Sequence, residues 1–286
     1  MNESENPSSK PKKFFDRDIQ DIKSLNFWRA VFAEYVGTWI LFQWTIGSAL
    51  HYPDEDASPP DILTAALCTG FVVAVVINAL LNVSGGHLNP AVSIGFLVLR
   101  KITCLRFVFY VIAQCLACLS AIAILNQMTP QDMVGLPALI SPAAGVTNVQ
   151  AFFFEFCIAF FLLFAIAAFI DGKRKDDTSP APFYVGLIVV GNILFSARTS
   201  GGCMNPARNF GPAVITGMTD TQWVYWLGPL LGGATGALLY DKFLSAEAMS
   251  SSPCVMCQRQ KSREQKTTES IAESTNEKER MLTTET

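Results

Sequence analysis

Two copies of the pattern Gly-Gly-x-x-Asn-Pro-Ala occur in the sequence, at residues 85–91 and 201–207. Asn is preferred at the position just before a helix, because its side-chain oxygen can accept a hydrogen bond from a free backbone N–H. Pro is favoured at the first helical position, where no N–H is needed. Asn89-Pro90 and Asn205-Pro206 are therefore each predicted to start a helix. Each Asn also offers its amide N–H groups to a passing molecule.

The two predicted helices are too short to cross a membrane. They cover about Ala91–Leu99 and Ala207–Thr216, and at 1.5 Å rise per residue about nine residues reach only about 14 Å. We expect two half-helices that enter from opposite faces and meet near the middle of the bilayer, each with about half a positive charge at its N-terminus. A water there accepts from both Asn amides, which interrupts proton hopping, and the positive helix ends oppose cations.

The rest of the sequence predicts the elements that hold these half-helices. Half of the 286 residues are hydrophobic and only 16% are charged, which is too apolar for an ordinary soluble domain. A transmembrane helix needs about 20 mostly apolar residues. Six such stretches are present, at about Phe27–Leu50, Ile62–Leu81, Phe107–Leu125, Ala151–Ile170, Pro182–Ala197 and Trp223–Tyr240.

The basic residues predict the orientation. Lys and Arg gather before or at the start of the first span, between spans two and three, between spans four and five, and after Tyr240. Only Arg198 and Arg208 fall on the other side. By the positive-inside rule, both termini are expected in the cytoplasm. We expect a multi-pass protein of the plasma membrane rather than of an internal membrane.

The chain is predicted to be an internal duplication. Glu34 opens the first half, Glu155 opens the second, and each half has three spans with the Asn-Pro-Ala segment between its second and third. Three is odd, so the second half enters from the opposite side, as in an inverted repeat. The predicted fold is an all-α membrane protein with six transmembrane helices and two re-entrant half-helices. It comprises a polar, mobile N-terminal tail (1–26), a channel domain (27–242, with halves of about 27–126 and 149–242) and a polar, mobile C-terminal tail (243–286).

The eight cysteines do not predict a disulfide framework. Cys254 and Cys257 form a single CxxC in the C-terminal tail. This is a weak indication of a zinc site, and the alternatives are palmitoylation near the membrane or plain reduced thiols. Ser262 follows Arg259 by three residues, the spacing that basophilic kinases read. Cys203 lies inside the second repeat, where its thiol either faces the pore or turns into the packing. No metal, cofactor or nucleic acid is expected.

With both motifs in tandem, the chain resembles the aquaporins, or major intrinsic proteins, over about Phe27–Tyr240. The run "GCMNPAR" from Gly202, followed by "FGPAV" and "WVYWLGPLL", looks most like the branch that contains the eighth mammalian aquaporin. The resemblance implies six spans and two half-helices per protomer, one pore in each protomer, and a homotetramer in the lipid bilayer.

The resemblance also implies roles for single residues. Its pore motifs are Asn89, Pro90, Ala91, Asn205, Pro206 and Ala207. An intramembrane carboxylate could be part of a proton relay, but in the family Glu34 and Glu155 correspond to residues that hydrogen-bond the backbone of the re-entrant loops. His87 corresponds to a satisfied loop residue rather than a proton carrier or metal ligand. Arg208, three residues after Asn205, corresponds to a pore residue.

Counting from each Asn places the family's selectivity constriction on Thr69, Ile193, Gly202 and Arg208. The strict water pores of the family have an aromatic residue at the first position and His at the second, so a wider constriction is expected here. The features of glycerol facilitators are missing as well. Asn209 stands where they have Asp, Ala213 replaces their basic residue, and Tyr225-Trp226 matches the water-type pair.

The function expected from these observations is a passive channel for water and small neutral solutes such as ammonia, hydrogen peroxide, and urea or glycerol. It should exclude protons and ions. The alternative from another class is a structural or adhesion protein of the same fold with little conduction. An enzyme lacks a paired catalytic constellation in this sequence, and a proton-coupled transporter has only the two glutamates in its favour.

Overall fold

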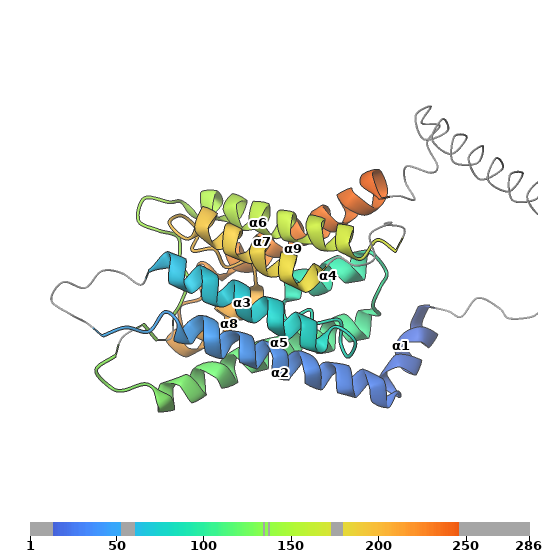
Figure 1. Ribbon diagram of the computed structural model, residues 1–286, viewed down its shortest axis with the longest axis horizontal. Helices are drawn as coiled ribbons and strands as arrows, with labels where there is room; N and C mark the ends of the chain where they lie inside the picture. The colour runs from blue at the N-terminus through green and yellow to red at the C-terminus, as the bar shows by residue number, and fades with distance from the viewer. Residues whose placement is uncertain (1–13, 53–60, 134, 137, 173–179, 246–286) are drawn as a thin grey trace, which may run out of the picture.

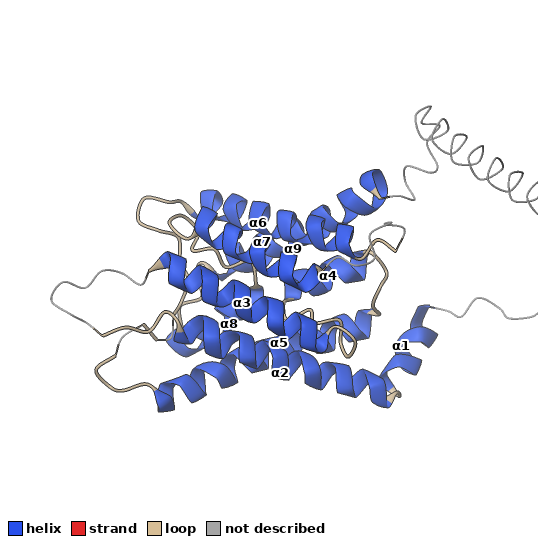
Figure 2. Ribbon diagram, viewed as in Figure 1, coloured by secondary structure: helices blue, strands red, loops and turns tan. Residues whose placement is uncertain are grey.

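The computed structural model describes residues 14–52, 61–133, 135–136, 138–172 and 180–245, and these residues form helices joined by loops (Figure 2). Residues 246–286, which include Cys254, Cys257 and Ser262, lie outside the described part. The helices are α1 (Phe14–Ile22), α2 (Leu25–Gly47), α3 (Ile62–Leu80), α4 (Pro90–Val98), α5 (Cys104–Met128), α6 (Asn148–Phe169), α7 (Ala181–Ser196), α8 (Pro206–Thr216) and α9 (Gln222–Leu239), followed by a π-helical turn (Tyr240–Leu244).

Each of the six predicted spans is a helix, with ends that differ by a few residues from the sequence prediction. α5 begins at Cys104 because the Thr103 side chain caps it, accepting from the backbone N–H of Arg106. Ser24 caps α2 in the same way. Three helices, α3, α5 and α6, are long and apolar enough to cross a membrane by themselves, and α7 is a shorter apolar helix.

The inverted repeat organises the packing of the helices. α2 packs against α5 in the first half, and α6 packs against α9 in the second. α3 and α7 pack against each other across the middle, while α4 lies against α9 and α8 against α5. Each half-helix is thus held mainly by the last helix of the opposite half. Figure 1 shows α1 and the end of α9 at the same end of the bundle.

Close approach of the helices depends on glycine. Gly228, Gly232 and Gly236 recur at every fourth position of α9, and a Cβ atom at each would meet a backbone oxygen of α6 at 3.1, 2.2 and 2.3 Å respectively. Such small-xxx-small faces allow helix backbones to touch in a membrane. α3 and α7 cross in the same way, because a Cβ on Gly70 would lie 2.7 Å from the oxygen of Gly186.

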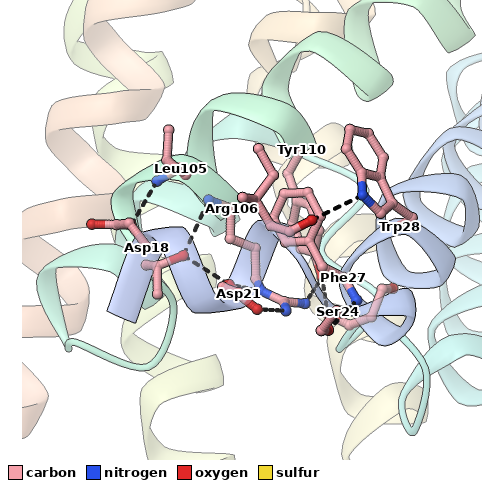
Figure 3. A network of polar contacts seen from close by, with 11 residues as sticks. Asp18, Asp21, Ser24, Phe27, Trp28, Leu105, Arg106 and Tyr110 are labelled. Carbon is pink, nitrogen blue, oxygen red and sulfur yellow. Dashed lines mark hydrogen bonds and ion pairs between the residues drawn. The ribbon is translucent and has the colours of Figure 1, made fainter. Parts of the chain in front are cut away.

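The N-terminal tail, expected to be mobile, contains a helix. α1 packs against α5, and two carboxylates of α1 hold it there by bonding to the first residues of α5 (Figure 3). Asp18, buried, accepts from the backbone N–H of Leu105 at 3.1 Å. Asp21 accepts from the Thr103 hydroxyl at 2.9 Å and forms an ion pair with Arg106. Carboxylates are favourable there because the positive end of the α5 dipole is close.

We expect Asp21→Ala to release α1 from the bundle. The substitution removes an ion pair and a hydrogen bond from groups that are less than a quarter exposed, so the free energy of unfolding should fall by about 1–2 kcal/mol. Thermal unfolding in detergent measures the change. Asp220→Ala, at an exposed carboxylate between α8 and α9, is the matched control. Equal melting temperatures for the two variants would contradict the docking role.

Candidate functional site: a pore between two half-helices

The loops before the two half-helices have the same backbone shape. Their φ angles are 92° and 60° at Gly85 and Gly86, and 93° and 67° at Gly201 and Gly202. Glycine is suited to these positions because a positive φ is costly for other residues. The residue before each Asn also has a positive φ of 55°. The sequence repeat is therefore a structural repeat at the level of single dihedral angles.

Both asparagines start their helices as predicted. The side-chain oxygen of Asn89 accepts from the backbone N–H of Ala91 at 2.7 Å, and that of Asn205 accepts from Ala207 at 3.1 Å. Pro follows each Asn in the first turn. The half-helices are α4 and α8, which begin at Pro90 and Pro206.

The two asparagines are also bonded across the repeat. Asn89 Nδ2 donates to the carbonyl of Met204 at 3.0 Å, and Asn205 Nδ2 donates to the carbonyl of Leu88 at 2.9 Å. Each amide nitrogen has two hydrogens, so one remains for another acceptor. The reciprocal bonds fix the two N-termini against each other.

Two buried glutamates hold the loops in place. Glu34 accepts from the backbone N–H groups of His87 and Leu88, at 2.8 and 2.6 Å. Glu155 accepts from those of Cys203 and Met204, at 2.9 and 2.7 Å, and from the Ser200 hydroxyl. Both glutamates are 0% exposed. Without them, four N–H groups of the re-entrant loops would lack acceptors inside the protein.

A narrow cavity of about 90 Å³ runs past both asparagines. Of the four residues predicted to form the constriction, Thr69 and Arg208 line this cavity. Ile193 and Gly202 are not among its lining residues but adjoin each other, since a Cβ on Gly202 would lie 3.3 Å from Ile193 Cα. Cys203 lines the cavity and is 5% exposed.

Two threonines are among the residues that line this cavity. Thr69 donates its hydroxyl proton to the carbonyl of Ala65 at 2.7 Å, which leaves its lone pairs for another donor. Thr45, on α2, also lines the cavity, and its buried hydroxyl has no hydrogen-bond partner among the residues that the structure describes. Sequence reasoning missed Thr45, although its position eleven residues after Glu34 could have been compared with that of Ile166 after Glu155.

Arg208 is held by the loop that precedes α6. Its guanidinium donates to the carbonyl of Ala138. The adjacent Asn209 is fully buried and fastens the same loop, accepting from the N–H of Ile140 at 2.8 Å and donating to its carbonyl at 3.0 Å. Asn209, read in the sequence only as a departure from glycerol facilitators, thus helps to fix the acceptor of the arginine.

His87 lies where the cavity meets a wider cleft. It is 3% exposed, its Nδ1 lies 3.1 Å from the Ser93 hydroxyl, and its ring packs on Phe96. It also lines a cleft of about 650 Å³, which α1 borders through Gln20 and Asp21. A hydrogen-bonded chain joins α1 to the pore loop here: Arg106 bonds both Asp21 and Tyr110, whose hydroxyl donates to the carbonyl of Ser84.

The position of Cys203 predicts sensitivity to mercury. Its Sγ contacts the carbonyl of Asn205 at 3.1 Å, and the residue lines the cavity while also packing against Tyr225. A mercury ion bound there would close the narrow path. We expect mercury to inhibit the wild type and Cys203→Ser to lose most of that inhibition in a liposome swelling assay. Cys157→Ser, at an exposed cysteine of α6, is the control, and equal inhibition of both variants would contradict the prediction.

Comparisons with known proteins agree with this geometry. A model of the family described as "Major intrinsic protein" matches residues 21–240. The chain is 37% identical to aquaporin-4 of Mus musculus over 216 residues, which are 75% of this chain and 67% of that one. It is 36% identical to the lens fiber major intrinsic protein of Lithobates pipiens over 224 residues, 78% of this chain and 84% of that one.

A solved structure supports the fold alone. The aquaglyceroporin from Plasmodium falciparum superposes with a TM-score of 0.63 at 24% identity, over 76% of this chain and 96% of that chain. The chain therefore belongs to the major intrinsic protein family, the aquaporins, and is an integral membrane protein with six transmembrane helices and two re-entrant half-helices arranged as an inverted repeat.

Proposed function

We propose that this chain conducts water and small neutral solutes passively and excludes protons and ions. As a member of the aquaporin family it is a membrane channel and not an enzyme. The observation that supports the proposal most strongly is the pair of cross-bonded asparagines in the narrow cavity. Each keeps one amide hydrogen for a permeating oxygen, and the α4 and α8 N-termini place positive potential at the same point.

The exclusion of protons follows from this arrangement. A water that accepts a hydrogen bond from both asparagines has its own hydrogens turned away from them, so neighbouring waters cannot pass a proton through it. The positive helix ends and Arg208, which lines the same cavity, add a barrier to cations. Neutral molecules meet neither obstacle.

The solute range is proposed to be wider than water. Thr69 provides a small hydroxyl residue where an aromatic ring would narrow the pore, and Arg208 remains available to donate to a carbonyl or hydroxyl group. Relative to a strict water pore, the flux of ammonia and hydrogen peroxide should increase most, followed by that of urea or glycerol. Placement in the branch of the eighth mammalian aquaporin is proposed from the "GCMNPAR" run.

Orientation and assembly are part of the proposal. The positive-inside rule supports cytoplasmic termini. α1 and the end of α9 lie at the same end of the bundle (Figure 1), as expected if both face the same side of the membrane. A homotetramer in the plasma membrane, with one pore in each protomer, is proposed from the family resemblance. Large apolar side chains such as Phe71, Val75 and Phe161 are exposed on the described surface, where lipid or a neighbouring protomer would cover them.

Reconstitution into liposomes tests the function. Purified protein should speed osmotic shrinkage several-fold without dissipating a pH gradient, and uptake of ammonia, peroxide, urea and glycerol gives the solute range. Folding is checked by size-exclusion chromatography before reconstitution. Unchanged shrinkage in folded samples would reject the channel in favour of a structural or adhesion role.

The width of the constriction is tested by adding bulk. Thr69→Phe with Ile193→His should restore the side chains of a strict water pore, and it should reduce solute flux at least several-fold while sparing water. Because Thr69 lines the cavity and Ile193 only adjoins Gly202, Thr69→Phe alone should produce most of the effect. If the wild type passes water alone and the double variant is indistinguishable from it, the assignment of these positions is wrong.

A further inference from the structure

The inverted repeat assigns each constriction residue an equivalent in the other half. Thr69 stands twenty residues before its Asn, and so does Val185. Ile193 and Ile77 each stand twelve residues before the Asn of their own half, and Gly202 and Gly86 each stand three residues before it. The equivalent of Arg208, three residues after its Asn, is Val92.

The structure shows that these equivalences are geometric as well. A Cβ on Gly86 would lie 3.1 Å from Ile77 Cα, and one on Gly202 would lie 3.3 Å from Ile193 Cα. Gly70 and Gly186, both nineteen residues before their Asn, touch each other where α3 crosses α7. The two ends of the pore are therefore built on the same backbone frame.

The four equivalents all line the cavity. Ile77, Gly86, Val92 and Val185 are among its lining residues, as is Ile166, the equivalent of Thr45. We call this set the Ile77 ring. It lies on the α1 side of the asparagines, because α3 runs toward that end of the bundle (Figure 1) and ends at Leu80, soon after Ile77. His87, which belongs to both the cavity and the α1-side cleft, adjoins it.

The two ends differ in chemistry although they share a frame. At the Arg208 end, the cavity is lined by Thr45, Thr69 and Arg208, whose side chains carry polar groups. At the other end, their equivalents Ile166, Val185 and Val92 present only hydrocarbon. The loop with Gly86 and His87 is then the one polar wall that the described residues give to this part of the path. A molecule there can form hydrogen bonds on one side only.

We propose that the Ile77 ring is a second selectivity filter, which discriminates among solutes by the number of hydrogen bonds they must give up. A polar group that leaves water without a new partner is strongly disfavoured. Water and ammonia are small and keep neighbours in single file along the polar wall. Urea and glycerol carry polar groups on several sides and must expose some of them to Ile77, Val92, Val185 and Ile166. This inference rests on the proposed channel function and specifies where its solute range is set.

Val185→Thr tests the filter with almost no change in shape, because it places at this end the hydroxyl that Thr69 provides at the other. We expect the ratio of urea flux to water flux to rise about fivefold, which corresponds to roughly 1 kcal/mol at 1.36 kcal/mol per decade. Val190→Thr is the matched control, since Val190 lies on the same helix but does not line the cavity.

A second variant guards against misfolding of the first. Ile77→Phe narrows the same ring without adding a polar group, and it should lower the urea-to-water ratio. Equal ratios in the wild type, Val185→Thr and Ile77→Phe, from folded samples that conduct water, would overturn the filter while leaving the channel intact. Absence of water flux in the folded wild type would instead reject the proposed channel function.

Discussion

Replacing Gly232 with Val should leave little folded protein. A Cβ atom at this position would lie 2.2 Å from the backbone oxygen of Phe156, and 2.9 and 3.0 Å from its carbonyl carbon and Cα. Backbone atoms cannot rotate away as a side chain can, so α9 would have to separate from α6 along their whole contact. Overpacking a well-packed site costs about 1–3 kcal/mol and sometimes more, and Val adds two methyl groups beyond the clashing Cβ.

The consequence extends to the pore, because α9 also supports α4. A Cβ on Gly233 would meet the oxygen of Ala91 at 2.7 Å, so displacement of α9 disturbs the first turn of that half-helix. The measurement is the yield and melting temperature of monodisperse protein in detergent. Gly191→Val is the matched control, since Gly191 is an exposed helical glycine with nothing within 4 Å of a Cβ. If both variants give wild-type yield and melting temperature, the glycine face does not determine the packing.

The features of this fold that could be predicted from the sequence are those that depend on short local patterns of residues. Asn followed by Pro predicts the start of a helix, and the capping hydrogen bonds of Asn89 and Asn205 confirm this prediction. Runs of apolar residues state where a span lies, and their order gives the inverted repeat. Each of these signals needs only neighbouring residues, so no knowledge of the tertiary fold is required to read them.

The parts that sequence did not predict depend on contacts between distant segments. α1 is polar in sequence, and it is ordered because Asp18 and Asp21 meet the start of α5 more than eighty residues later. Asn209 became informative only when its two bonds to Ile140 were seen. Ile193 was placed in the constriction by counting, but the cavity lining also depends on how its helix is rotated, which spacing alone leaves open.

Substitution of Glu155 is expected to remove conduction in a graded way. Glu155→Leu leaves the backbone N–H groups of Cys203 and Met204 without an acceptor, at about 1–3 kcal/mol each. The carbonyl of Met204 is the acceptor for Asn89, so a shift of this loop also loosens the opposite half-helix. We expect poor folding and at least a tenfold loss of water flux in liposomes. Glu155→Gln keeps the shape of the side chain and one acceptor oxygen. Its folding and its water flux should be intermediate between those of Glu155→Leu and the wild type.

The same series at Glu34 separates a structural role from a proton relay. Glu34 accepts a hydrogen bond from the Gln114 side-chain amide, whose oxygen has no hydrogen-bond partner within the described part of the chain. If Gln114 turns its amide, that oxygen can accept from a new amide at position 34, so Glu34→Gln should be milder than Glu155→Gln in both melting temperature and water flux. A proton relay predicts otherwise. In that case both Gln variants would fold and conduct water normally, and the only loss would be in proton movement.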